Sequence, residues 1–199
     1  MRRRSATSAE PSPPTVRRPT ADDARRVAVW RFQHGERVDM NTVASQLGIG
    51  RTTLYRWVGD REKLMDYVIL ESVDDLWRQS LTAAAGDGIE YALDAVARFI
   101  RATTAYAPLA RFVEREPNLA LRVLLDPAGL VVTALTSGLA AAITAAAPEL
   151  EVPPPTYGVL SVAATAVVWA NVAGGREPDI DSTVAIMRTV LLAHERREP

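Results

Sequence analysis

A run of hydrogen-bonding side chains, with no acidic residue among them, occupies positions 51–56 of the 199-residue chain. Its members are Arg51, Thr52, Thr53, Tyr55 and Arg56. An arginine can pair with guanine through two hydrogen bonds, and a threonine can bond a base edge or touch a thymine methyl. A tyrosine suits a phosphate oxygen, as do main-chain N–H groups at a helix start. The run therefore has the chemistry to read the major groove of duplex DNA.

Two side chains outside this run are expected to contact the DNA backbone. Thr42 lies near the start of a short helix expected over 41–47, where it suits a phosphate oxygen. Lys63 falls in the first turn of a helix that Asp60 is expected to cap. The competing interpretation is an ordinary helical hairpin whose polar face is merely solvated.

The surrounding residues have the spacing of two helices that cross at a tight turn. Ala44 supplies a small residue at the crossing, and Gly48, four positions later, tolerates a positive φ. Ile49 fills the turn, and Leu54 is a core residue of the second helix, expected from Arg51 to Trp57. The same small core is expected to include Val43 and Leu47. The pattern predicts a helix-turn-helix.

Charge is divided unevenly along the chain. Residues 1–65 hold 13 basic and 7 acidic residues, a net charge of +6, whereas residues 66–199 hold 10 and 17, a net charge of −7. This asymmetry indicates that the first third meets a polyanion. The alternative is that arginine-rich termini are simply solvated.

Residues 1–19 are rich in proline and arginine and almost free of apolar side chains, so we expect a disordered basic arm. The arm either follows DNA into the adjacent minor groove or only adds solubility. Its arginines are Arg2, Arg3, Arg4, Arg17 and Arg18.

Helical periodicity continues from Thr20, an expected N-cap, to about Arg196, and no segment alternates as a strand would. The predicted fold class is all-α, with a helix-turn-helix domain at 20–65 and a helical domain at 66–199. Pro117 and Pro127 are expected at helix starts, the second behind a capping Asp126. Asp179 or Asp181 is expected to open the last helix.

Two uncharged segments, 128–147 and about 156–173, reach the length of a membrane hairpin. Their alanine, threonine and glycine content favours buried or interface helices instead. The second segment and the last helix carry apolar residues that suit a four-helix dimer interface. These residues are Val159, Val162, Val167, Val168, Ile186, Val190 and Leu191.

The segment from Val38 to Leu64 resembles the DNA-binding domain of TetR-family regulators. The matching positions are Val38, Ala44, Gly48, Ile49, Leu54, Tyr55, Trp57, Lys63 and Leu64. The chain departs from that pattern at Val58–Gly59, which puts the geometry at the end of the third helix in question. The resemblance implies about nine helices, a homodimer on a palindromic operator, and a ligand that shifts the fourth helix. The segment Arg115–Gly129 also resembles a subgroup linked to the degradation of quorum-signal lactones.

A mostly apolar effector pocket is expected between helices of the second domain. Its candidate residues, each of which plain core packing would also explain, are Phe99, Thr103, Tyr106, Phe112 and Trp169. Arg111 is a further candidate for a ligand oxygen, although a surface position is the simpler expectation.

No catalytic residues, metal site or cofactor are predicted. The chain has no cysteine, and its two histidines, His34 and His194, lie near opposite ends. No nucleophile–base set was found after Gly88. The favoured function is a cytoplasmic, homodimeric, ligand-responsive transcriptional repressor with DNA and a small effector as partners. The alternatives are a non-specific architectural DNA-binding protein and, third, a helical enzyme.

Overall fold

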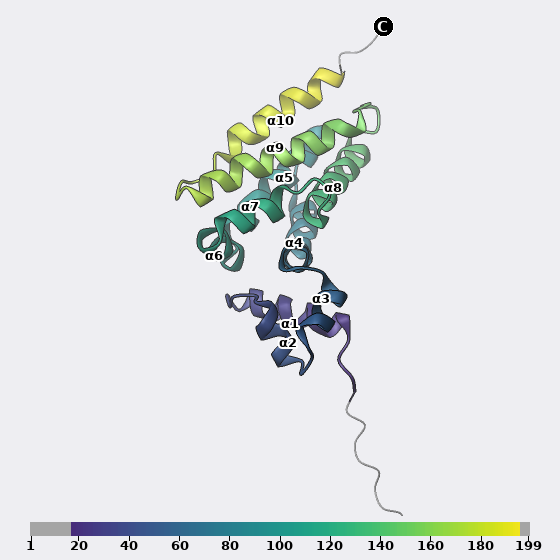
Figure 1. Cartoon of the computed structure of the whole chain (residues 1–199). Helices are drawn as coiled ribbons and strands as arrows, with labels where there is room; N and C mark the ends of the chain where they lie inside the picture. The colour runs from purple at the N-terminus through teal and green to yellow at the C-terminus, as the bar shows by residue number, and fades with distance from the viewer. Residues whose placement is uncertain (1–16, 196–199) are drawn as a thin grey trace, which may run out of the picture.

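The computed structural model describes residues 17–195, which form ten helices and no strand (Figure 1). Three short helices, α1 (Ala21–Gln33), α2 (Met40–Gln46) and α3 (Arg51–Val58), gather at one end, and α4 (Arg61–Ala83) leads from them into the larger group. The larger group contains α5 (Gly88–Ala105), α6 (Ala107–Arg115), α7 (Pro117–Leu125), α8 (Leu130–Ala146), α9 (Pro154–Ala173) and α10 (Ile180–Glu195). The all-α prediction is confirmed. Residues 1–16 of the predicted arm, with Arg2, Arg3 and Arg4, lie outside the described residues.

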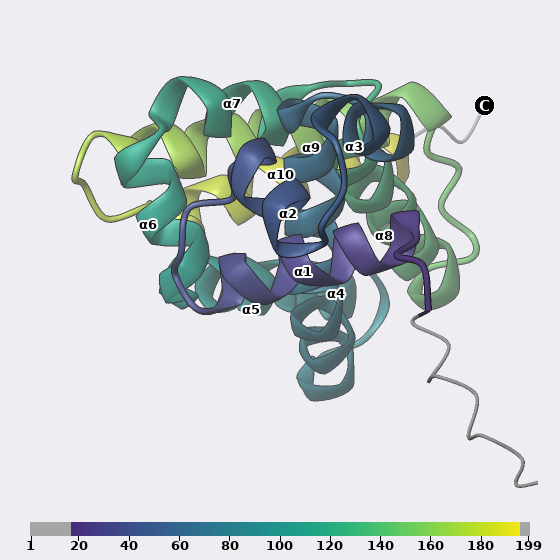
Figure 2. The same cartoon turned by 60° about the horizontal axis from the view of Figure 1, so that its bottom comes forward.

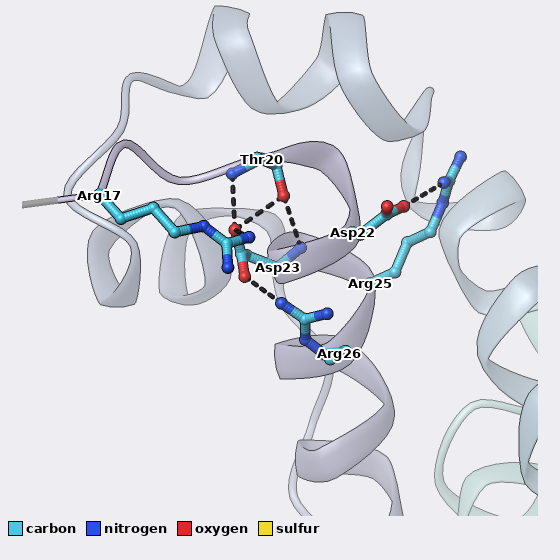
Figure 3. A network of polar contacts seen from close by, with 6 residues as sticks. All are labelled: Arg17, Thr20, Asp22, Asp23, Arg25 and Arg26. Atoms are coloured by element: carbon cyan, nitrogen blue, oxygen red, sulfur yellow. Dashed lines mark hydrogen bonds and ion pairs between the residues drawn. The ribbon is translucent and has the colours of Figure 1, made fainter.

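Thr20 caps the N-terminus of α1 as expected, through a reciprocal capping box (Figure 3). The Thr20 hydroxyl oxygen accepts a hydrogen bond from the Asp23 main-chain N–H, and the Asp23 carboxylate accepts one from the Thr20 N–H at 2.8 Å. Arg17 and Arg26 both pair with the same carboxylate. Hydrogen bonds from the Thr20 hydroxyl and, next, from its main-chain N–H hold the pKa of Asp23 below its usual range. These contacts fix the residue at which α1 begins.

The start of α8 corrects the sequence prediction. Asp126 and Pro127 do not open this helix, because Asp126 closes a turn in which its carboxylate accepts from the Ala128 N–H at 3.0 Å. The helix begins at Leu130 instead. Its first N–H groups donate to the carboxylate of Asp66 on α4, at 2.5 Å from Leu130 and 2.9 Å from Val131. A distant carboxylate therefore caps α8, which no local pattern could reveal.

Helix α4 lies at the centre of the fold and packs against α1, α5, α7 and α8. Its inward side chains Leu64, Met65, Val68 and Ile69 are at most 1% exposed. They belong to one apolar core that continues from α1 to α10. Because α4 runs unbroken through positions 65 and 66, the predicted boundary between the two domains falls inside a shared helix.

Helices α9 and α10 pack against each other at the end of the molecule away from α1–α3 (Figure 1). Val159, Val167 and Ile186 are exposed there by 68%, 51% and 64%. Val168 and Leu191, expected on the same face, are buried within the chain at 3% and 0% exposure, because they point toward the core. The predicted interface therefore needs this correction.

Helix α9 is long and apolar enough to cross a membrane by length and composition alone. Helices α7 and α8 pass the same test only as a pair, and they bend by 45° at their junction. Helix α9 packs against α6, α7, α8 and α10, as a core helix of a bundle does. Within the described range, its composition is accounted for by helix packing.

Candidate DNA interface and effector cavity

Helices α2 and α3 cross as the residue spacing predicts. Ala44 is 3% exposed at the crossing, and Gly48 adopts a φ of 64° in the turn. The Ile49 N–H donates to the Ala44 carbonyl oxygen at 3.0 Å, which closes the turn. Val43 and Leu54 have no exposed surface. The pair is a helix-turn-helix that rests on α1 (Figure 2).

The outer side of α3 carries most of the side chains predicted to read bases. Arg51, Thr52, Tyr55 and Arg56 are exposed, and we call these four residues the α3 surface. Thr53 is half-buried beside them. Neither arginine forms an ion pair with any carboxylate of residues 17–195, and no acidic residue lies in α3. The guanidinium groups are thus unneutralised by the described part of the protein.

Thr42 takes part in the start of α2, which Asp39 caps. The Asp39 carboxylate accepts from the main-chain N–H groups of Asn41 and Thr42 at 2.9 and 3.1 Å. The Thr42 hydroxyl lies 3.4 Å from the same carboxylate oxygen. The bond from the Thr42 N–H holds the pKa of Asp39 below its usual range. Sequence reasoning overlooked this cap, although an aspartate three residues before Thr42 is a common N-cap signal.

Two polar links join the start of α4 to the α6–α7 corner. Arg61 donates to both carboxylate oxygens of Glu116 at 2.5 and 2.7 Å, and its Nε donates to the Val38 carbonyl oxygen at 2.6 Å. The two side chains are each 21% exposed, and the Arg61 bonds hold the pKa of Glu116 below its usual range. Beside this link, Arg122 of α7 donates to Glu62, the residue after Arg61, at 2.9 Å. The helix that follows α3 is therefore tied to the larger group of helices.

A cavity of about 180 Å³ lies among the helices of the larger group. Its walls come mainly from α4, α5, α8 and α9, with single residues from other helices. Phe99, Thr103 and Trp169, three of the five candidate pocket residues, line it. The wall is predominantly aliphatic and aromatic, so a ligand there exchanges water for apolar contacts.

The other two candidates lie at the junction with α1 and outside this cavity. The rings of Tyr106 and Phe112 pack on Phe32 of α1, with centroid distances of 6.4 and 6.1 Å. Burial raises the pKa of the Tyr106 hydroxyl. Arg111 is exposed, and its guanidinium lies over Gly35, so that a Cβ added at Gly35 would come within 2.6 Å of an Arg111 nitrogen. Arg111 is therefore a junction residue and does not line the cavity.

Residues 87–192 match a family model described as the tetracycline repressor-like C-terminal domain, which covers more than half of the chain. The chain belongs to the TetR family. A solved structure of the transcriptional repressor QsdR of R. erythropolis, a TetR-family protein, is 26% identical to the chain and superposes with a TM-score of 0.79. That similarity covers 86% of this chain and 93% of QsdR, so it includes the helix-turn-helix. No curated protein matches the sequence.

TetR membership carries the general function with it. The chain is a ligand-responsive transcriptional repressor and not an enzyme, in keeping with its family and with its structural neighbour. Regulators of this family bind operator DNA and small effectors and act as dimers. Resemblance to the subgroup linked to lactone degradation stays a prediction.

The departure of this TetR chain from its family pattern at Val58–Gly59 has a local explanation. Val58 is buried at 9% exposure, and Gly59 ends α3 with φ 75° and ψ −152°, a conformation that is essentially restricted to glycine. The Gly59 N–H still donates to the Tyr55 carbonyl oxygen at 2.9 Å. The end of α3 is thus regular, and the Lys63 side chain packs over the glycine, 2.8 Å from where a Cβ would lie.

Several cavity residues of this TetR protein were not anticipated from the sequence. Ser161 and Thr165 line the cavity from α9, and Asp74 and Trp77 line it from α4. The available signal was the spacing of Ser161 and Thr165, four positions apart in an otherwise apolar helix, which puts two hydroxyls on one face. Asp74 and Trp77 have no comparable signal, because only the packing of α4 shows which side they face.

Proposed function

We propose that the protein is a homodimeric repressor that grips a roughly palindromic operator with the α3 surfaces of two subunits and releases it when a small, mostly apolar molecule fills the cavity. The observation that carries this proposal is the exposed, unneutralised α3 surface at the crossing of α2 and α3. A recognition helix with one arginine in its first turn and another in its last turn, neither of them paired within residues 17–195, suits direct readout of guanine in the major groove. A repressor that binds operator DNA acts in the cytoplasm, which is the proposed location of this protein.

The proposed roles of the individual side chains follow from their positions. Arg51 and Arg56, with Thr52 and Thr53, read base edges, while Tyr55 contacts a phosphate. Thr42 and Lys63 hold the DNA backbone on either side of the groove. Each of the seven side chains has an N–H or O–H group that can donate to a phosphate oxygen or a base edge, and none of the seven is buried.

A second copy of the chain is the proposed partner for the outer face of α9 and α10. The exposed Val159, Val167 and Ile186 would be costly in water, and two such helix pairs can bury one another as a four-helix interface. The helix-turn-helix domains of the two subunits would then be related by the same two-fold symmetry as the operator half-sites. Changing Val159 and Ile186 together to glutamate should yield a monomer in analytical ultracentrifugation, and a persistent dimer would exclude this face.

Footprinting on the DNA upstream of the protein's own gene tests the function as a whole. A repressor of this kind should protect a palindrome, whereas an architectural DNA-binding protein would coat DNA regardless of sequence.

Arg51→Ala or Tyr55→Ala should each weaken binding to the protected site by about 1–3 kcal/mol without unfolding the protein. Arg176→Ala, which removes an exposed arginine far from α3, is the matched control. If both α3 variants bound the operator as tightly as the wild type, α3 would not be the helix that reads it.

A further inference from the structure

Two hydroxyl groups in the cavity wall differ from the other buried serine and threonine hydroxyls of residues 17–195. Five Ser and Thr residues are buried in the described part of the protein: Ser80, Thr103, Ser161, Thr165 and Thr183. Three of them donate to a main-chain carbonyl oxygen of the preceding helical turn. Ser161 and Thr165, at 7% and 9% exposure, have no hydrogen-bond partner among residues 17–195. Among the described residues, the one enclosed side-chain atom without a partner is His194 Nε2, so the Ser161 and Thr165 hydroxyls open onto the cavity and can pair with a molecule inside it.

Ser161 and Thr165 contribute to the same wall of the cavity. Ser161 and Thr165 are one helical turn apart on α9, so their side chains share a face, and both line the cavity. Trp77 of α4 also lines it, packs edge-on against Phe99 at 5.4 Å, and has no acceptor for its indole N–H among the described residues. An indole N–H can only donate, whereas a hydroxyl can donate or accept. A ligand oxygen that accepts hydrogen bonds is therefore a group to which each of the three could donate.

The charge of the wall limits what that oxygen can belong to. Asp74 is the one ionisable residue that lines the cavity in the described structure, and it lies at the edge with 53% of its side chain exposed, paired with Arg78 at 2.6 Å. A carboxylate ligand would find no cation in the wall and would be repelled by Asp74. Burying an unpaired charge in an apolar site is unfavourable. The wall therefore selects against organic anions.

Size sets the third limit. A dry protein cavity of about 150 Å³ accommodates benzene. The cavity here is about 180 Å³, which suits a molecule of about eight non-hydrogen atoms.

We propose that the effector is a neutral, mainly aliphatic molecule with a carbonyl-type oxygen that accepts hydrogen bonds from Ser161 and Thr165. As a statement about regulation, this rests on the proposed repressor function. As a statement about binding, it depends only on the cavity.

Calorimetric titration of the full-length protein with two small probes of matched chain length tests the ligand class. 2-Heptanone is neutral and has one acceptor oxygen, while heptanoate is ionised at about pH 7.5. The ketone should bind, and heptanoate should bind at least about tenfold more weakly, a difference of about 1.4 kcal/mol. Heptanoate binding as tightly as the ketone, or no ketone binding at millimolar concentration, would overturn the proposal.

Variants separate hydrogen bonding from general apolar affinity. The double variant Ser161→Ala/Thr165→Val keeps the volume of the wall and should lower ketone affinity about tenfold with an unchanged melting temperature. Thr82→Val, at an exposed position of α4 outside the cavity, is the control and should bind the ketone normally. Asp74→Asn should raise heptanoate affinity severalfold. Unaltered ketone affinity in the double variant would overturn the role given to the two hydroxyls.

Operator release, measured in the same proteins, keeps the two proposals apart. Release by 2-heptanone in the wild type and not in the double variant supports both. If the ketone binds through the hydroxyls but leaves operator affinity unchanged, the ligand class stands and the effector role of the cavity falls. If wild type and double variant release the operator at the same ketone concentration, the repressor function stands and the ligand class falls.

Discussion

The α3 surface and the cavity are assembled in opposite ways. The residues proposed to contact DNA all come from positions 42–63, and turn geometry within that segment is enough to place them. The cavity residues run from Ile69 to Met187 and come together only when α4, α5, α8 and α9 pack. The first site is charged and lies on the surface, and the second is apolar and lies between packed helices. We therefore expect the α3 surface to tolerate changes elsewhere in the fold, whereas the cavity should respond to changes in any of the helices that pack around it.

The largest effects are expected from removing one buried leucine side chain from the core of each part of the molecule. Leu54 of α3 and Leu93 of α5 are 0% and 1% exposed, so Leu54→Ala and Leu93→Ala should each cost about 2–5 kcal/mol of the free energy of unfolding. Leu54→Ala should reduce operator affinity more than cavity binding, and Leu93→Ala should do the reverse. Denaturant unfolding with operator and probe titrations would measure this. Parallel losses in both variants would show that the two sites are not separable.

The contrast also explains what the sequence could predict. Ala44, Gly48 and Leu54 sit at fixed offsets along one short segment, so the helix-turn-helix was visible from spacing alone. The cavity residues were predicted only in part. In a helix without a strong apolar stripe, the side chains that face the cavity are determined by packing against helices distant in the chain. Tyr106 and Phe112 illustrate this, since both look like pocket aromatics but pack on Phe32 of α1. The α8 start was mispredicted for the same reason, because its cap comes from Asp66.

A smaller effect tests the local character of the α3 surface. Gly59→Ala forces a Cβ into a glycine-restricted conformation and should cost about 1–3 kcal/mol. The α3 surface would shift with the helix end, so operator affinity should fall in electrophoretic mobility assays. Gly50→Ala is the matched control, since Gly50 has φ −72° and nothing lies within 4 Å of an added Cβ. Equal behaviour of the two variants would argue against strain at Gly59.

The smallest expected effect concerns the link between the two parts. Glu116→Gln keeps the shape of the α6–α7 corner but removes the charge that pairs with Arg61, which should cost about 1 kcal/mol. Because the pKa of Glu116 lies below its ordinary value of 4.5, this stabilisation is complete above that value and is lost as the pH falls further. Thermal unfolding at about pH 7 and about pH 4 should therefore separate wild type and variant more at the higher pH. A constant difference would mean that the pair contributes no pH-dependent stability.

Because the Asp66 carboxylate caps α8, the position of the junction matters when helix-turn-helix domains are exchanged between related regulators. If a foreign helix-turn-helix domain is joined before Arg61, then Arg61, Glu62 and Asp66 remain those of the recipient protein. Their contacts with Glu116, Arg122 and the first turn of α8 are then preserved. A cut placed after Asp66 imports foreign residues at all three positions. Hybrid regulators built on this scaffold should therefore keep the whole of α4 with the sensing half.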